Sequence, residues 1–135
     1  KQEIALLSKA LRAKSEAETA SLVRDFLDRR ERRRVDHGFD ATLIDYERQL
    51  EWEEGLAKYV ELAAWRAAYE AAGYAPVPGM SGDPDFKSYR RWQRRWSQER
   101  AEMKRQATRE GEPRFYYTGM AQAMLLDRLR RRGRS

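Results

Sequence analysis

The stretch that decides the fold is residues 51–72, EWEEGLAKYVELAAWRAAYEAA. From Leu56 to Ala72, leucine, valine, tryptophan, tyrosine and alanine fall on nearly every side of a helical wheel. Such a pattern is typical of a helix that other helices surround. We therefore predict a long, central, apolar helix over about 41–72, closed by Gly73.

The overall composition favours an all-α protein. Charged residues make up 37% of the 135 residues and the apolar set 41%, while β-branched residues are scarce. This length suits one hydrophobic core. We expect a single helical domain over 1–135, with about five helices packed around the central one.

Local signals place the other helices. Ser15 and Glu18 form a Ser-x-x-Glu capping box, and Gly38 and Asp40 suit the end of one helix and the start of the next. The proline- and glycine-rich stretch 74–84 predicts a loop. The predicted helices cover about 2–14, 15–36, 41–72, 85–109 and 118–131, with Gly111 and Pro113 breaking the chain before the last one.

Charge and residue usage exclude several classes of site. The net charge of +6, from 28 basic and 22 acidic residues, supports solubility more than nucleic-acid binding. The absence of cysteine excludes disulfides and thiolate zinc sites. One histidine, His37, excludes a self-contained His-Glu-x-x-His motif, and we interpret it as a capping or surface residue. No apolar run approaches the roughly 20 residues that span a bilayer.

Acidic side chains follow one face of the predicted central helix. Residues three or four positions apart share a helical face, so one stripe contains Glu47, Glu51, Glu54, Lys58 and Glu61. The simplest interpretation is a solvated edge, on which a Glu54–Lys58 pair adds a few tenths of a kcal/mol.

The run Glu54-Gly55-Leu56-Ala57-Lys58-Tyr59 resembles the third-ligand helix of zinc metallopeptidases of the glutamate-zincin group. In that group an earlier helix carries two zinc-binding histidines in a His-Glu-x-x-His motif. Residues 26–33, 45–48, 115–119 and 125–129 also look similar to the C-terminal part of bacterial, often secreted, metallopeptidases. The chain departs from the better-known members in having Glu53 where they have asparagine, and it lacks both histidine ligands.

This resemblance implies a role for several residues. Glu54 would be the third zinc ligand, completing a tetrahedral site with two imidazoles and a water. Gly55 would let the histidine-bearing helix approach closely. The residues implied to support the site are Glu51, Tyr59 and Glu61.

Tyr116 and Tyr117 are implied to stabilise the oxyanion that forms when a metal-activated water attacks a peptide carbonyl. Aromatic packing is the alternative for both tyrosines.

The chain does not start with Met, and its first residues already follow a helical pattern. We therefore expect that the histidine motif lies in a missing N-terminal segment. Zinc and peptide substrate would then bind only to the complete protein, and this chain alone would be inactive. The resemblance also implies that the parent protein is secreted or periplasmic.

Two alternatives do not involve catalysis. Helix 85–109 and the tail from Arg128 are basic, and a nucleic-acid or acidic protein partner would contact Arg90, Arg91, Arg94 and Arg95. However, Tyr89, Trp92 and Trp96 fall on one helical face, which favours a place in the core and disfavours nucleic-acid binding. The second alternative is a structural protein that buries an apolar patch between Trp52 and Trp65 in an oligomer.

Overall fold

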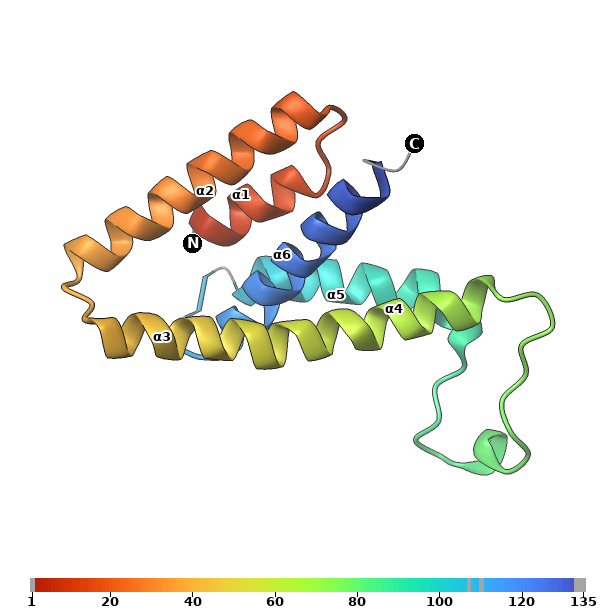
Figure 1. Ribbon diagram of the computed structural model, residues 1–135. Coiled ribbons are helices and arrows are strands. Elements are labelled where there is room, and N and C mark those ends of the chain that lie inside the picture. Colours follow the sequence, from red (N-terminus) through yellow and green to blue (C-terminus); the bar gives the residue numbers. More distant parts are fainter. Residues whose placement is uncertain (1, 107, 110, 133–135) are drawn as a thin grey trace.

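The computed structural model describes residues 2–106, 108–109 and 111–132. Within these residues the fold is all-α, as predicted, with α1 (Gln2–Ala10), α2 (Glu16–Asp36), α3 (Ala41–Leu50), α4 (Leu56–Glu70), α5 (Trp92–Gln106) and α6 (Pro113–Arg132). A π-helical turn, Glu51–Gly55, joins α3 to α4, and two short 3-10 helices cover Met80–Gly82 and Tyr89–Arg91. Because α3, the π-turn and α4 form one rod (Figure 1), the helices make up five rods, close to the predicted number.

The rods are arranged around α6. The hairpin of α1 and α2 lies on one side of the long rod, and α5 runs beside α4 (Figure 1). The segment between α4 and α5 loops away from the other helices at the end of the rod (Figure 1). α6 crosses the rod at the π-turn and contacts α1, α3, α4 and α5 as well.

The hydrophobic core is therefore centred on α6 and not on the 41–72 helix. Tyr117 to Ala121 are buried without interruption, and Leu125 follows one turn later. The core residues from the other helices are Ile4, Leu7, Ala10, Phe26, Leu62 and Met103.

The prediction of a surrounded central helix does not hold for the long rod. Trp52 is 70% exposed and Val60 54%, and most alanines of α4 are exposed as well. Among the described residues, the elements that pack on α4 from outside the rod are α5, α6 and the 3-10 helix Tyr89–Arg91. An alanine-rich helix reads as apolar all round in sequence, although its small side chains bury little area and tolerate solvent.

Several predicted helix ends are confirmed. The Ser15 hydroxyl accepts a hydrogen bond from the Glu18 amide (3.1 Å) at the start of α2. Asp40 accepts one from the Leu43 amide (2.8 Å) at the start of α3. Gly38 has a φ of 61°, the left-handed conformation that ends a helix.

Other boundaries differ for local reasons. α1 stops at Ala10, and the Arg128 guanidinium donates to the Ala10 and Leu11 carbonyls (both 3.1 Å), which satisfies the helix end. α6 starts at Pro113, five residues earlier than predicted. Proline is favoured at the first position of a helix, because the amide hydrogen that it lacks would have no partner in the first turn. The basic tail begins at Arg128, and residues 133–135 at its end lie outside the described residues.

Candidate functional site

The π-turn Glu51–Gly55 contains three of the residues that the resemblance singles out, Glu51, Glu54 and Gly55. A π-turn adds a residue to one helical turn, so the side chains before and after it leave the regular α-helical register. Such turns are frequent at functional sites. Here the turn is also the part of the rod against which α6 packs.

Gly55 and Gly119 make the contact between the π-turn and α6. A Cβ atom on Gly55 would lie 2.6 Å from the Gly119 carbonyl carbon and 2.8 Å from the Met120 nitrogen. A Cβ atom on Gly119 would lie 2.9 Å from the Gly55 Cα. The place at Gly55 that was predicted for a histidine-bearing helix is therefore occupied by α6 of this chain.

The buried side chain of Glu51 holds the first residue of the π-turn in place. Its carboxylate is buried and accepts hydrogen bonds from the Arg30 guanidinium (Nη1 to Oε2, 2.9 Å) and from the Thr118 hydroxyl. One carboxylate thus joins the turn to α2 and α6. These hydrogen bonds explain why Glu51 is buried. Its role in supporting a metal ligand remains a prediction.

Glu54 lies on the same turn and is half-buried. The expected pair with Lys58 is absent: the Lys58 ammonium lies 3.0 Å from Glu99 of α5, and no ion pair joins Glu54 to any described residue. Glu53, its neighbour, is exposed and accepts a hydrogen bond from the Gln49 amide (3.0 Å). Glu54 is therefore a carboxylate on a braced backbone whose own oxygens are uncommitted within the described part of the chain.

Two further predicted residues follow on α4. Tyr59 is half-buried, and burial together with the nearby Asp127 carboxylate raises the pKa of its hydroxyl. Glu61 accepts a hydrogen bond from Arg95 (2.6 Å). Both are held by residues of other helices, so neither is free to move without breaking a contact.

Tyr116 and Tyr117 lie in the first half of α6. Tyr117 is buried, and desolvation with the neighbouring Glu99 carboxylate raises the pKa of its hydroxyl to about 12. The Lys58 ammonium lies 5.4 Å from the centre of its ring. This environment matches the packing alternative for Tyr117, and Tyr116 is half-buried against the core.

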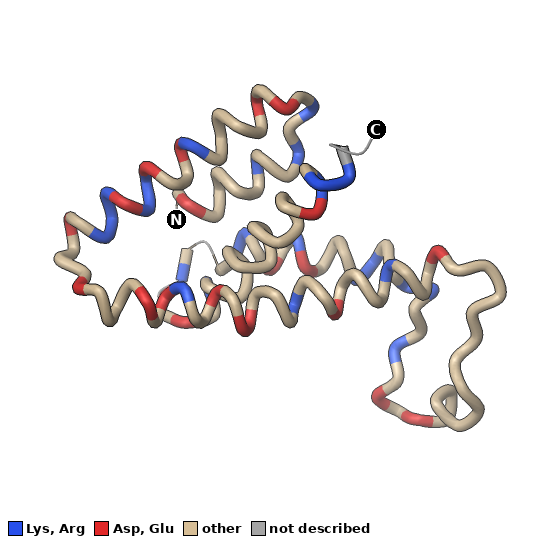
Figure 2. The backbone as a smooth tube through the Cα atoms, viewed as in Figure 1, with Lys and Arg blue, Asp and Glu red and all other residues tan. Residues whose placement is uncertain are grey.

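A buried charge network lies next to the turn, and sequence reasoning missed it. Glu47, 1% exposed, accepts hydrogen bonds from Arg34 (3.0 Å) and Arg33 (2.5 Å). Burial alone would raise the pKa of Glu47, but the two arginines outweigh it and lower the pKa. Figure 2 shows the basic residues of α2 and the acidic residues of the rod. The acidic stripe was the feature of the sequence that could have revealed this network, but it was interpreted as a solvated edge.

The four arginines of the alternative basic surface differ in their pairing and exposure. Arg95 pairs with Glu61 (2.6 Å) and Glu99 (2.9 Å), so its charge is already neutralised. Arg90, Arg91 and Arg94 are exposed.

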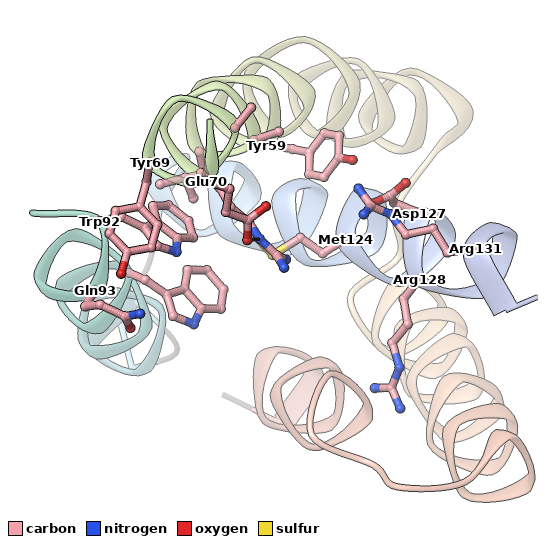
Figure 3. Close-up of a pocket in the computed structure, with 14 residues that line it drawn as sticks. Tyr59, Tyr69, Glu70, Trp92, Gln93, Met124, Asp127, Arg128 and Arg131 are labelled. Carbon is pink, nitrogen blue, oxygen red and sulfur yellow. Dashed lines mark hydrogen bonds and ion pairs between the residues drawn. The ribbon is translucent and has the colours of Figure 1, made fainter. Parts of the chain in front are cut away.

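A cleft of about 710 Å³ lies between α4, α5 and α6 (Figure 3). The rings of Trp92 and Trp96 stack on each other with centroids 5.9 Å apart and form part of its wall. Both tryptophans are half-buried, so they contact the core and the cleft together. The charged residues among those that line it are Arg66, Glu70, Asp127, Arg128 and Arg131.

Across residues 2–106, 108–109 and 111–132, no three histidine or acidic side chains gather closely enough to hold a metal ion. Nor does any helix in these ranges combine the length and hydropathy that crossing a bilayer requires. Comparison of the chain with protein-family models, curated proteins and solved structures finds no match.

Proposed function

We propose that this chain supplies one metal-ligating carboxylate, that of Glu54, to a zinc peptidase site whose histidines come from a segment outside this sequence. The observation that carries the proposal is the bracing of the turn around an uncommitted carboxylate. Glu51 is hydrogen-bonded before Glu54, Gly55 is packed on Gly119 after it, and Lys58 is paired with Glu99.

Bracing matters because a metal ligand must hold its position. Ligands on rigid elements lose little entropy when the metal binds, and surrounding hydrogen bonds fix their orientation. The buried carboxylate of Glu51, the glycine–glycine contact and the Lys58–Glu99 ion pair lie within two turns and hold the backbone of Glu54 in place.

The donor set fits only in part. One carboxylate is a common third ligand for zinc, whereas the described residues gather no three histidine or acidic side chains into a metal-binding group. The complete site therefore requires two imidazoles from another segment, and this chain by itself is proposed to be inactive towards peptides.

The first test is the coding sequence upstream of Lys1. The proposal expects a His-Glu-x-x-His motif in frame within about 100 codons, on a segment long enough to pack against the rod. A start codon immediately before Lys1 would overturn the proposal.

The aromatic cleft supports a second candidate function, the binding of a small amphipathic molecule. A volume of about 710 Å³ falls within the range of known ligand pockets, roughly 300–1,000 Å³. An anilinonaphthalene sulfonate dye tests it: saturable binding that Trp96→Ala abolishes and Trp52→Ala retains would support a ligand site. Equal binding by all three proteins would contradict it.

A further inference from the structure

A groove of about 480 Å³ lies between α1 and α5, next to the aromatic cleft. Its apolar lining comes from Leu11, Trp96 and Met103, and Ser8 and Ser97 line it as well. Trp96 also lines the aromatic cleft, so the two hollows adjoin at its side chain. The groove therefore combines an aromatic side chain with hydroxyl groups that can donate hydrogen bonds.

Three basic side chains line the groove too, those of Arg12, Arg100 and Lys104, whereas none of its described lining residues is acidic. All three are exposed, and none of them forms an ion pair with a described residue. Glu18 lines a neighbouring hollow together with Arg12 but forms no ion pair with it. The guanidinium carbon of Arg100 lies 5.8 Å from the centre of the Trp96 ring, which places its charge beside the aromatic side chain.

The acidic residues of α1 and α5 do not neutralise these cations. They are Glu3 of α1 and Glu99 and Glu102 of α5. Each is already paired with another basic residue: Glu3 with Arg33, Glu99 with Lys58, and Glu102 with Arg105. The positive charge of the groove is therefore not compensated by the two helices that form it.

Exposed cations continue along α5 beyond the groove. Arg94 is exposed, as are Arg90 and Arg91 of the 3-10 helix that precedes α5. Within α5, whose residues are all described, no exposed residue is acidic. Exposed cations on one face attract anionic partners. A small anion would use the groove alone, so the wider basic face favours a polymer.

We propose that the groove and the basic face of α5 bind single-stranded nucleic acid. Its phosphates would lie against Arg12, Arg100 and Lys104, and a base would pack on Trp96. Proteins that bind single strands combine these two features, a basic path for the backbone and aromatic side chains for the bases. The sequence pattern disfavoured nucleic acid because it placed Trp96 in the core, but Trp96 is half-buried and lines the groove.

Other polyanions fit this surface less well. A helix that binds a membrane surface buries bulky apolar side chains in it, whereas the exposed residues of α5 are arginine, lysine, glutamine, serine and alanine. An acidic peptide would pair with the cations but has no planar group to cover Trp96. The bases of a duplex are stacked on one another, so a duplex would leave Trp96 uncovered as well.

The test is the fluorescence anisotropy of a labelled single-stranded oligonucleotide of about ten nucleotides, titrated with the whole chain. We expect saturable binding whose association constant falls with salt, with a logarithmic slope of about −0.7 for each phosphate contacted. The duplex of the same sequence, phosphatidylserine vesicles and polyglutamate are compared at the same salt concentration. Each should bind at least about fivefold more weakly, because none can stack a base on Trp96.

Two double variants of equal net charge locate the site. Arg100→Gln with Lys104→Gln removes two cations of the groove, whereas Arg24→Gln with Arg29→Gln removes two exposed cations of α2. The groove variant should weaken binding by about tenfold or more and make the salt slope shallower by about 1.4. The α2 variant should bind like the unmodified protein.

Trp96→Ala should weaken binding of the single strand by about fivefold or more and change binding of the duplex little. Arg100 and Lys104 do not line the aromatic cleft. The groove variant should therefore lose the oligonucleotide and still bind the naphthalene dye, which separates this proposal from the second candidate function. The proposal is also independent of zinc.

Equal losses in the two double variants would show that net charge governs binding, and would overturn the proposal. Equal affinity for the duplex, the vesicles or polyglutamate would do the same, as would a lack of binding at low salt. The comparison of polyanions on the unmodified protein decides the matter even if Trp96→Ala fails to fold.

Discussion

Gly55 and Gly119 bring the π-turn and α6 into direct backbone contact. Neither position has room for a methyl group, since a Cβ on Gly55 would meet backbone atoms of Gly119 and Met120 closer than 3 Å. Backbone atoms cannot rotate away as side chains do. This contact sets the crossing point of the two helices on which the candidate site depends.

Gly55→Ala should therefore destabilise the protein, although alanine favours helix. Overpacking typically costs about 1–3 kcal/mol and more where backbone must shift, against about 1 kcal/mol gained in helix propensity. Chemical denaturation measures the difference. Gly82→Ala is the matched control, because no atom lies within 4 Å of a Cβ there. A fully stable Gly55→Ala protein would refute the close crossing.

Glu47 should contribute more to stability than any exposed carboxylate. Glu47→Gln leaves Arg33 and Arg34 with weakened pairing in a buried position, which costs about 3 kcal/mol or more. Asp45→Asn breaks only an exposed pair with Arg48 and should cost less than about 1 kcal/mol. Equal effects of the two changes in urea unfolding would contradict the buried network.

The same carboxylate predicts how stability depends on acid. The folded-state pKa of Glu47 lies below its ordinary value of 4.5, so its contribution is complete above pH 4.5. That contribution is lost as pH falls through the lower, folded pKa. Stability measured from pH 6 to pH 3 should fall less steeply in Glu47→Gln than in the unmodified protein.

The raised pKa of Tyr117 predicts that the protein loses stability at alkaline pH. Its pKa is raised from 10.0 to about 12, so the folded state holds its proton more tightly than the unfolded state does. Its stabilising contribution is complete below pH 10 and is lost as pH rises towards 12. Ultraviolet titration of the seven tyrosines should show a late step that Tyr117→Phe removes. A late step that survives this substitution would assign it to another tyrosine.

The sequence predicted what depends on neighbouring residues along the chain. The caps at Ser15 and Asp40 and the helix end at Gly38 follow from local hydrogen bonding and backbone preference, and all three are found. The all-α class follows from composition for the same reason.

What depends on contacts between distant residues was not predicted. Glu47 and Glu51 read as a solvated stripe, because their arginine partners lie on another helix. α6 was not recognised as the central helix, because its buried run YTGMA, residues 117–121, contains polar and small residues whose importance depends on their contacts with Gly55 and Glu51. The proposed role of Glu54 as a metal ligand could not be tested within this sequence, because the two histidines that it requires are absent from the chain.

The most direct test of the central proposal is the zinc content of the protein that includes the segment encoded upstream. We expect about one zinc per chain in the unmodified protein, a large loss in Glu54→Gln, and no loss in Glu53→Gln, which changes the neighbouring exposed carboxylate of the same turn. Circular dichroism would confirm that all three proteins are folded. Retention of zinc in folded Glu54→Gln, or absence of zinc in the unmodified protein, would contradict the assignment of Glu54 as a metal ligand.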